Sequence, residues 1–295
     1  GAAVLEWLDE PLARCGDGGD MPQVHSPRPH LHPVHSLAGT ALTQVSPVDH
    51  RHHYGVSFAV ADVDGTSHWG GRTYVPGQGP TLLSNHGRQT AVDQRVADEG
   101  ATLASDVVWT DEHGRLQLQE ERALTAVVVP DEGAWVLGWR SALTAPRGAT
   151  LSSPAVHGRA GAGYGGPFWR LPPADEVRVA TAQGSSESEA HGSRSPWLVV
   201  NRRSGGSWSS LLLVQGTAPD LQAAQLLPWF VRATDYVGVG PALAWAEPLL
   251  LPAGERLDVA LTAVVLDRWV DAADADGLAR SALARLAAAR GGRSG

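Results

Sequence analysis

"GRLQLQEERALTAVVVPDEGAWVLGWRSALTA", residues 114–145, is the stretch that decides the fold. It holds two long runs rich in Val, Leu and Trp, separated by the turn signal Asp131-Glu132-Gly133. Apolar runs of this kind, bounded by Gly, Pro and Asp, are typical of β-strands. Glu120 and Glu121 are adjacent inside the first run, so one side chain should face inward and the other outward. The stretch therefore predicts β-structure.

The same pattern of runs and turns continues along the chain. Further turn signals, each centred on glycine, are Asp64-Gly65, Asn85-His86-Gly87, Glu112-His113-Gly114 and Pro252-Ala253-Gly254. Runs such as "YGVSFAVADV" (54–63) and "ERLDVALTAVVLD" (255–267) lie between turns, and the chain's 34 glycines and 20 prolines suit many tight turns. This regular series of strands predicts an all-β fold, an antiparallel β-sandwich or barrel.

One segment near the C-terminus departs from this pattern. "DADGLARSALARLAAARGG", residues 274–292, carries Leu278, Leu283 and Leu286 near helical spacing, with Asp274 or Asp276 as a plausible N-cap. It predicts one C-terminal helix. The small, polar segment 181–195 predicts an exposed loop. No repeat or linker divides the sequence, so residues 1–295 are expected to form a single β-sandwich domain.

Composition excludes several function classes. The formal net charge of −8 and the absence of basic runs disfavour a nucleic-acid partner. All 23 basic residues are arginines, so neither a Schiff-base lysine nor a P-loop lysine exists. The single Cys15 excludes an intrachain disulfide and a cysteine-based zinc site. The sequence contains no run of about 18 apolar residues, so no membrane span is predicted. Because the N-terminal residues also lack a signal-peptide pattern, a cytoplasmic location is expected.

Histidines gather in one part of the sequence. Eight of the 12 lie between His25 and His68, and "SPVDHRHHYG" (46–55) holds three of them beside Asp49. Pro47 disfavours helix for Ser46, and Gly55 marks a bend where a strand begins. Residues 49–53 are therefore expected to form a loop that could bring His50 and His53 together.

Three interpretations of this loop stay open. His50 or His53 could be a general acid or base, oriented by Asp49, because the ordinary pKa of histidine is about 6.5. Alternatively, His50, His53 and His86 could ligate a divalent metal ion, with Asp49 fixing a tautomer. The third interpretation is a set of surface and packed histidines without function.

Further polar and aromatic residues are candidates for binding a ligand. Arg72 could hold a carboxylate or hydroxyl groups, and the loop 161–170 could bring Tyr164 and Trp169 onto a flat sugar ring. The carboxylates that could serve as acid/base partners are scattered along the sequence: Glu120, Glu121, Asp235 and Glu247.

The sequence resembles, over most of its length, a soluble bacterial family labelled "methane oxygenase PmoA". The family's R-P…H-P segment, its D-H-x-x-H-x-G motif and the hairpin and Trp that follow match Arg28, Pro29, His32, Pro33, Asp49, His50, His53, Gly55, Asp62 to Gly65 and Trp69. The likeness continues through 85–88, 163–172 and 228–254. His68 stands where the family usually has Asp or Asn, which makes it a weak site candidate.

The resemblance implies a sugar-related protein rather than a methane oxygenase. A particulate methane monooxygenase subunit crosses the membrane, and this sequence predicts no membrane span. The family is expected to be a β-sandwich similar to the galactose-mutarotase supersandwich. Its members look like parts of carbohydrate catabolism, beside oxidoreductases that make keto-sugars.

We therefore expect a carbohydrate-active enzyme that cleaves, eliminates or isomerises a glycoside or keto-sugar. His50 and His53 would be the acid/base pair with Asp49 orienting one of them. The residues expected to bind the sugar are His32, Arg72, His86, Tyr164, Trp169 and Arg170. A sugar-binding or regulatory protein without turnover is the first alternative, and a metal-dependent enzyme is the second.

Overall fold

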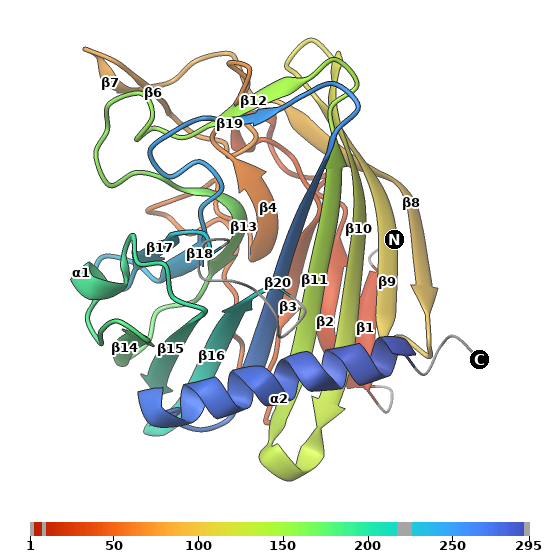
Figure 1. Ribbon diagram of the computed structural model, residues 1–295, viewed down its shortest axis with the longest axis vertical. Helices are drawn as coiled ribbons and strands as arrows, with labels where there is room; N and C mark the ends of the chain where they lie inside the picture. The colour runs from red at the N-terminus through yellow and green to blue at the C-terminus, as the bar shows by residue number, and fades with distance from the viewer. Residues whose placement is uncertain (1–2, 8–9, 217–225, 292–295) are drawn as a thin grey trace.

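Two large antiparallel sheets packed face to face form the body of the molecule (Figure 1). The computed structural model describes residues 3–7, 10–216 and 226–291. The smaller of the two sheets has seven strands, which in spatial order are β1 (Ala3–Trp7), β2 (Glu10–Gly16), β3 (His30–Val34), β4 (Val56–Val60), β13 (Gly165–Arg170), β18 (Gly238–Pro241) and β17 (Trp229–Arg232).

The larger sheet is built around the hairpin formed by residues 114–145. Its eight strands in spatial order are β14 (Glu176–Thr181), β15 (Trp197–Ser204), β16 (Ser207–Gln215), β20 (Arg256–Leu266), β11 (Ala134–Thr144), β10 (Leu116–Val129), β9 (Thr102–Thr110) and β8 (Arg88–Ala97). The β10–β11 pair is continuous from Gln119 opposite Thr144 to Val129 opposite Ala134. The predicted strands thus lie at the centre of this sheet.

Shorter elements cover one end of the sandwich and its outer surfaces. One small sheet has three strands, β19 (Leu249–Leu251), β12 (Ala149–Ser152) and β5 (Asp62–Val63). Another has two strands, β6 (Thr73–Val75) and β7 (Gly79–Thr81). The helical elements are η1 (Gln23–His25), η2 (Pro130–Glu132), α1 (Glu187–Ala190) and α2 (Ala272–Gly291). Figure 1 shows β6, β7, β12 and β19 together at the end of the molecule opposite α2.

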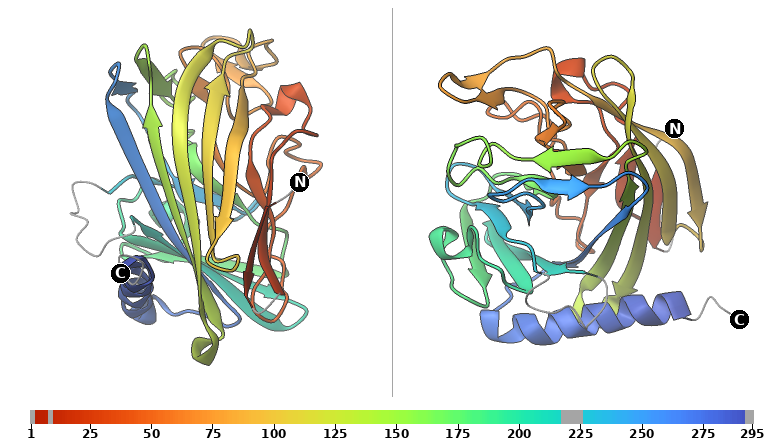
Figure 2. Two further views of the ribbon diagram at one scale, coloured as in Figure 1. Left: turned by 90° about the vertical axis from the view of Figure 1, so that its right-hand side faces the viewer. Right: turned by 45° about the horizontal axis from the view of Figure 1, so that its top comes forward.

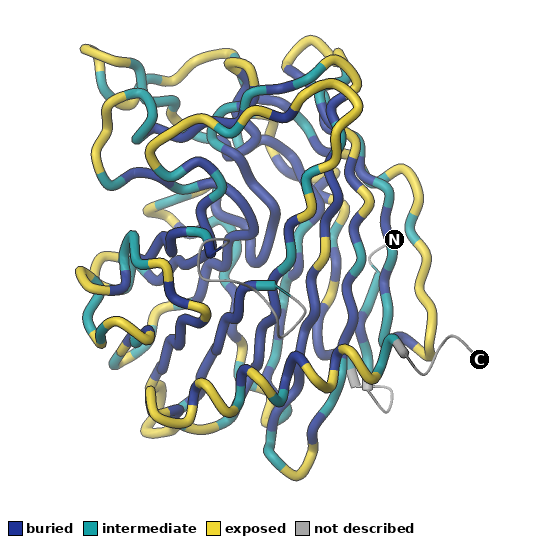
Figure 3. Tube along the Cα trace, in the orientation of Figure 1, coloured by how far each residue is buried: buried dark blue, intermediate teal, exposed yellow. Residues whose placement is uncertain are grey.

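The core lies between the two large sheets. Alternate residues of both sheets supply it, among them Phe58 and Trp169 from the smaller sheet and Trp139 and Leu211 from the larger one. Figure 3 shows the strands largely buried and the exposed segments mainly in loops, in the edge strand β8 and along the outer side of α2. The packing explains the alternation of apolar and polar residues in the predicted strands.

The predicted C-terminal helix is confirmed as α2, apart from Gly292, which lies outside the described residues. Leu283 and Leu286 pack with Val136 and Val264 on the outer face of the larger sheet (Figure 2). Gly138 lets the helix approach closely, because a Cβ there would lie 3.0 Å from Leu286. The fold is therefore an all-β sandwich with one long C-terminal helix, as the sequence predicted.

The prediction of an exposed loop over 181–195 is wrong in part. The short helix α1 lies inside this segment, and Ser186 caps it by accepting a hydrogen bond from the backbone N–H of Glu189. The Glu189 side chain in turn accepts from the backbone N–H of Ser186, which completes a capping box. Among the described residues, no helix is long and apolar enough to cross a membrane.

Candidate functional site

The outer face of the seven-stranded sheet carries a cluster of aromatic rings and a buried arginine. On β13, Trp169 packs into the core between the sheets, whereas its neighbour Phe168 belongs to a separate aromatic cluster with Trp69 and Phe230. Because adjacent strand residues point to opposite faces, Arg170 lies on the same face as Phe168. Loops and small strands cover this face and form the candidate site on it.

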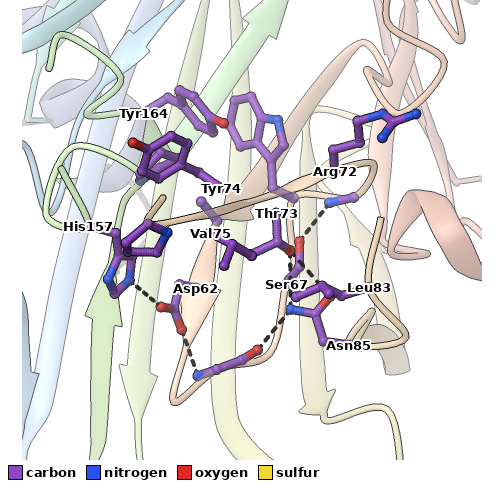
Figure 4. Close-up of a pocket in the computed structure, with 16 residues that line it drawn as sticks. Asp62, Ser67, Arg72, Thr73, Tyr74, Val75, Leu83, Asn85, His157 and Tyr164 are labelled. Atoms are coloured by element: carbon purple, nitrogen blue, oxygen red, sulfur yellow. Dashed lines mark hydrogen bonds and ion pairs between the residues drawn. The ribbon is translucent and has the colours of Figure 1, made fainter. Parts of the chain in front are cut away.

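A pocket of about 250 Å³ lies beside this aromatic cluster, and we call it the tyrosine pocket. Its lining side chains come from five separate segments of the chain: Ala61, Asp62, Ser67, Trp69, Arg72, Thr73, Tyr74, Val75, Pro76, Leu83, Asn85, Pro154, His157 and Tyr164. Figure 4 shows His157, Tyr74 and Tyr164 on one side of the pocket and Leu83 and Asn85 on the other. The Trp69 and Tyr164 rings pack at 4.4 Å between centroids.

An aspartate–histidine pair forms part of the pocket wall. His157 Nε2 lies 2.7 Å from Asp62 Oδ2, while Asp62 Oδ1 accepts the backbone N–H of Gly65 at 2.6 Å. Asp62 therefore fixes the ring with the proton on Nε2, which leaves a lone pair on Nδ1. Nδ1 has no hydrogen-bond partner within the described ranges. This arrangement suits a general base.

The other polar groups of the pocket differ in how many hydrogen bonds they already make within the protein. The Asn85 amide donates to Gly65 O at 2.9 Å and to Thr73, so the far wall is fixed. Arg72 makes one long contact, 3.5 Å to Pro80 O, and the Tyr74 hydroxyl bonds to no described residue. Arg72 and Tyr74 thus retain donors that a ligand could use.

The loop 49–53 lies on the other side of Trp69. It forms what we call the histidine cluster: Asp49, His50, His53, Arg170 and Tyr236. The His50 and His53 rings stack at 4.6 Å between centroids, and the Arg170 guanidinium lies 4.6 Å from the Tyr236 ring centre. Arg170 Nη2 and His50 Nδ1 donate to Asp49 Oδ2 at 2.9 and 2.8 Å. Although partial burial opposes ionisation, these bonds lower the pKa of Asp49 to about 2.

The structure does not support His53 as an acid or base. Its side chain is only 2% exposed, and its ring packs edge-on against Trp69 and Phe168. Burial, reinforced by His52, His50 and Arg170, holds its pKa well below the ordinary value, so His53 stays neutral. His50, whose side chain is 33% exposed and hydrogen-bonded to Asp49, keeps an acid/base-like geometry at the surface.

Three predicted sugar-binding residues lie elsewhere. Trp169 is 1% exposed, and its indole N–H donates to Leu42 O at 2.7 Å, so it is a core residue. His86 is buried and its Nε2 donates to Gly71 O at 2.7 Å, which supports the backbone behind Arg72. His32 contacts Thr43 Oγ1 at 2.9 Å and lines no part of the tyrosine pocket.

The predicted metal set is not assembled. Over the described ranges, no three His, Cys, Asp or Glu side chains are placed to hold one ion. The buried His86 bonds a carbonyl oxygen through Nε2, whereas the His50 and His53 rings stack face to face at 4.6 Å between centroids. Because the nitrogen lone pairs lie in the ring planes, stacked rings do not direct them at one shared ion.

His68 and the four scattered carboxylates lie outside the tyrosine pocket. His68 is fully buried and bonds Gln117 Oε1 at 2.8 Å. Glu120 lies in the core, and Glu121, Asp235 and Glu247 are exposed and do not line the tyrosine pocket. None of these five residues can act on a ligand in that pocket.

Sequence reasoning missed Asp62, Tyr74 and His157. Asp62 belongs to the hairpin that matches the family resemblance, and His157 begins the glycine-rich stretch 157–166. The two pair across 95 residues, through the β5–β12 pairing that joins Leu151 to Val63 and Ser152 to Asp62. No local pattern signals a pairing of this kind.

A buried arginine fixes the loops of both parts of the site. Arg28 is 1% exposed and donates to the carbonyl oxygens of His52, at 2.8 Å, and Trp69, at 3.2 Å, and to Ser57 Oγ, at 2.9 Å. Gly70 is required beside it, because a Cβ there would lie 2.4 Å from His25 O and φ is +93°. Trp69 and the histidine loop are thus placed by the same guanidinium.

The free energy of unfolding is expected to decrease as the pH is lowered below neutrality. Burial lowers the pKa of His30 and His68 to about 4 and that of His52 to about 3, and it holds that of His53 well below its ordinary value. The unfolded chain binds protons at these histidines below pH ~6.5, whereas the folded chain does not, so acid favours unfolding.

We expect each such histidine to cost about 1–2 kcal/mol of unfolding free energy between pH 6.5 and 5. Denaturant titrations at several pH values measure the slope of the unfolding free energy against pH. The His113→Ala variant, whose side chain is 66% exposed in the wild type, should leave it unchanged. A stability that is flat or rises towards pH 5 would contradict the burial of neutral histidines.

Comparisons with known proteins place the chain in a family. A model described as "Family of unknown function (DUF6807)" matches residues 2–280. None of the curated proteins matches the chain in sequence.

Similarity to solved structures is distant. A structure titled "Polysaccharide Lyase BACCELL_00875" is 10% identical with a TM-score of 0.36, over 94% of this chain and 35% of that chain. One titled "Crystal Structure Analysis of HI1317" is 10% identical with a TM-score of 0.32, over 90% and 99%. The GH36 alpha-galactosidase AgaA from Geobacillus stearothermophilus is 11% identical with a TM-score of 0.29, over 79% and 29%. The chain thus spans about a third of the lyase, and at such TM-scores these likenesses carry no argument about activity.

Proposed function

We propose, for this chain that belongs to the DUF6807 family of unknown function, an activity argued from its site alone. The chain binds one ring of a glycoside or keto-sugar in the tyrosine pocket, and His157 acts on that ring as an acid/base. One observation carries this proposal: the Asp62–His157 pair leaves Nδ1 unpartnered in the wall of a pocket lined by tyrosine and tryptophan rings.

The size and lining of the pocket favour a small, flat, polar ligand. Its volume of about 250 Å³ lies just below the range of pockets for drug-sized molecules, which suits a single sugar ring. Aromatic side chains provide apolar surface for the C–H groups of a sugar ring, and tyrosine adds a polar hydroxyl. The open donors of Arg72 and Tyr74 would meet sugar oxygens.

The acid/base groups favour proton transfer over two-carboxylate hydrolysis. Glycoside hydrolases of the usual kind need two carboxyl groups flanking the scissile bond. Asp62 is the one carboxylate among the described residues that line the tyrosine pocket, and it is bound to His157. A histidine poised as a base is instead suited to removing a proton from carbon.

A 3-keto-glycoside is the substrate that such a base could use most readily. The ketone at C3 acidifies the C2–H bond, and His157 Nδ1 would take this proton to give an enolate. Loss of the C1 substituent with its bonding electrons then forms a C1–C2 double bond, and the departing oxygen accepts a proton. Arg72 is the cation in the pocket that could stabilise the enolate oxygen.

The experiment compares 3-keto-glycosides with the same glycosides bearing a hydroxyl at C3. We expect the wild-type protein to release the C1 substituent from the keto form alone. NMR of the products measures this release. Release from both forms at equal rates would contradict proton abstraction beside a ketone. Binding of both forms with no product from either would identify a sugar-binding protein without turnover.

A further inference from the structure

We propose that the histidine cluster is a carboxylate-binding site, which the chain's own Asp49 occupies, and that the sugar ligand carries a carboxylate, as uronates do. The identity of the ligand as a sugar rests on the proposed function. The carboxylate site stands on separate contacts, on the other side of Trp69 from the tyrosine pocket.

Three hydrogen bonds converge on one carboxylate in this cluster. Arg170 Nη2 lies 2.9 and 3.2 Å from the two Asp49 oxygens, and His50 Nδ1 lies 2.8 Å from Oδ2. A guanidinium beside an imidazole N–H is a good match to a planar carboxylate. The chain therefore already displays the binding geometry with its own side chain.

The donors are held in place independently of Asp49. The Arg170 side chain is 4% exposed and its guanidinium lies against the Tyr236 ring at 4.6 Å. The His50 ring packs against two rings that also contact each other, those of His53, at 4.6 Å, and Tyr236, at 4.5 Å. These contacts would persist if another carboxylate replaced that of Asp49.

Asp49 itself is the least constrained member of the cluster. Its side chain is 45% exposed, and it lies in a loop beside Val48, which is 83% exposed. It contributes no apolar packing to the cores of the molecule. Its carboxylate could therefore swing into solvent without disturbing the donors.

The charge around the cluster favours an anion. Arg28 and Arg170 are both buried here, and Arg51 adds a third guanidinium in the same loop. Among the described residues, Asp49 is the one carboxylate that any of these three arginines contacts, since Arg28 and Arg51 donate to carbonyl and hydroxyl oxygens. A net positive region within a chain of charge −8 attracts an anionic ligand.

The position of the cluster connects this anion to the sugar. The His53 ring lies 5.6 Å from Trp69, and Trp69 lines the tyrosine pocket and packs on Tyr164. To reach Arg170, whose Nη1 lies 3.4 Å from His53 Nδ1, a ligand in the pocket would carry its carboxylate past the rings of both Trp69 and His53. A carboxylate on that ring, or on the adjoining sugar, is the group these donors fit.

The test uses matched sugars that differ only in charge. Glucuronate and galacturonate are titrated beside their C6 amides and beside glucose and galactose, with affinity measured by calorimetry or ligand-observed NMR. We expect at least one uronate to bind about ten- to a hundred-fold more tightly than its amide. The Asp49→Ala variant should bind that uronate more tightly still, because the internal competitor is gone, and should bind the amide as the wild type does.

A second variant, Arg170→Gln, should abolish the preference for the uronate. If this buried substitution prevents folding, the exposed Asp49→Ala substitution decides alone. Equal affinity for uronates, amides and neutral sugars would overturn the carboxylate site and leave the proposed function standing. A uronate preference without turnover of any keto-glycoside would support the site and overturn the proposed chemistry. No binding by any of these sugars would overturn the carboxylate site, and the turnover of keto-glycosides would then decide the proposed function separately.

Discussion

The Glu120→Ala variant is expected to lose about 3–5 kcal/mol of unfolding free energy. Glu120 is 2% exposed between the two sheets and accepts hydrogen bonds from Arg122 Nε, at 2.7 Å, and from Trp109 Nε1, at 2.9 Å. Ser141 Oγ also donates to it. Alanine would leave the buried Arg122 guanidinium without a counter-charge, which is the costly way to break a buried pair. Denaturant unfolding followed by tryptophan fluorescence measures the change.

The neighbouring residue provides the matched control. Glu121 lies on the opposite face of β10, where its exposed side chain contacts Arg256 at 3.2 Å. Because exposed ion pairs contribute little, Glu121→Ala should change the free energy of unfolding by less than about 1 kcal/mol. Equal losses in the two variants would show that the β10 strand is not oriented as described.

The second large effect concerns the base of the tyrosine pocket. His157→Ala should lower kcat/KM on a turned-over keto-glycoside by about 10²–10⁴-fold, the usual contribution of a general acid/base. The side chain is 38% exposed, so its removal should leave the fold intact. Steady-state kinetics, with circular dichroism to confirm folding, measures the effect.

Two other histidines make this test specific. His113→Ala removes an exposed histidine outside the tyrosine pocket and should leave kcat/KM unchanged. His50→Ala removes the other histidine that is hydrogen-bonded to an aspartate. Turnover that survives His157→Ala but disappears in His50→Ala would move the acid/base role to the histidine cluster.

Much of the fold was predictable because apolar alternation reports burial directly. The adjacent acids Glu120 and Glu121 were expected on opposite faces, and the structure confirms it. Leucine spacing placed the C-terminal helix within two residues of its observed start at Ala272. The short helix α1 was missed although Ser186 and Glu189 have capping-box spacing, because no apolar periodicity accompanies them.

The site was predicted only in part. Arg72 and Tyr164 do line the tyrosine pocket, and Asp49, His50 and Arg170 do contact one another. Trp169 and Arg170 are adjacent on β13, and sequence could not tell which of them faces the core. The resemblance to the soluble family labelled methane oxygenase PmoA stays a prediction.

His53 is buried although the other residues of the loop 49–53 are exposed or half-buried, and the sequence carries no signal for this difference. Histidine spacing suggested a reactive pair, but only contacts from distant strands show that His53 packs against Phe168. The Asp62–His157 pair was missed for a related reason, because it depends on the pairing of β5 with β12. Contacts between distant segments, rather than local patterns, build this site.

The most direct measurement is a crystal structure of the His157→Ala variant soaked with the sugar that binds. We expect density for a sugar ring between Tyr74, Tyr164 and Asn85, with a ring C–H facing the position that the imidazole of His157 occupies in the wild type. Density for the sugar on another surface, with the tyrosine pocket holding only water, would contradict sugar binding in this pocket.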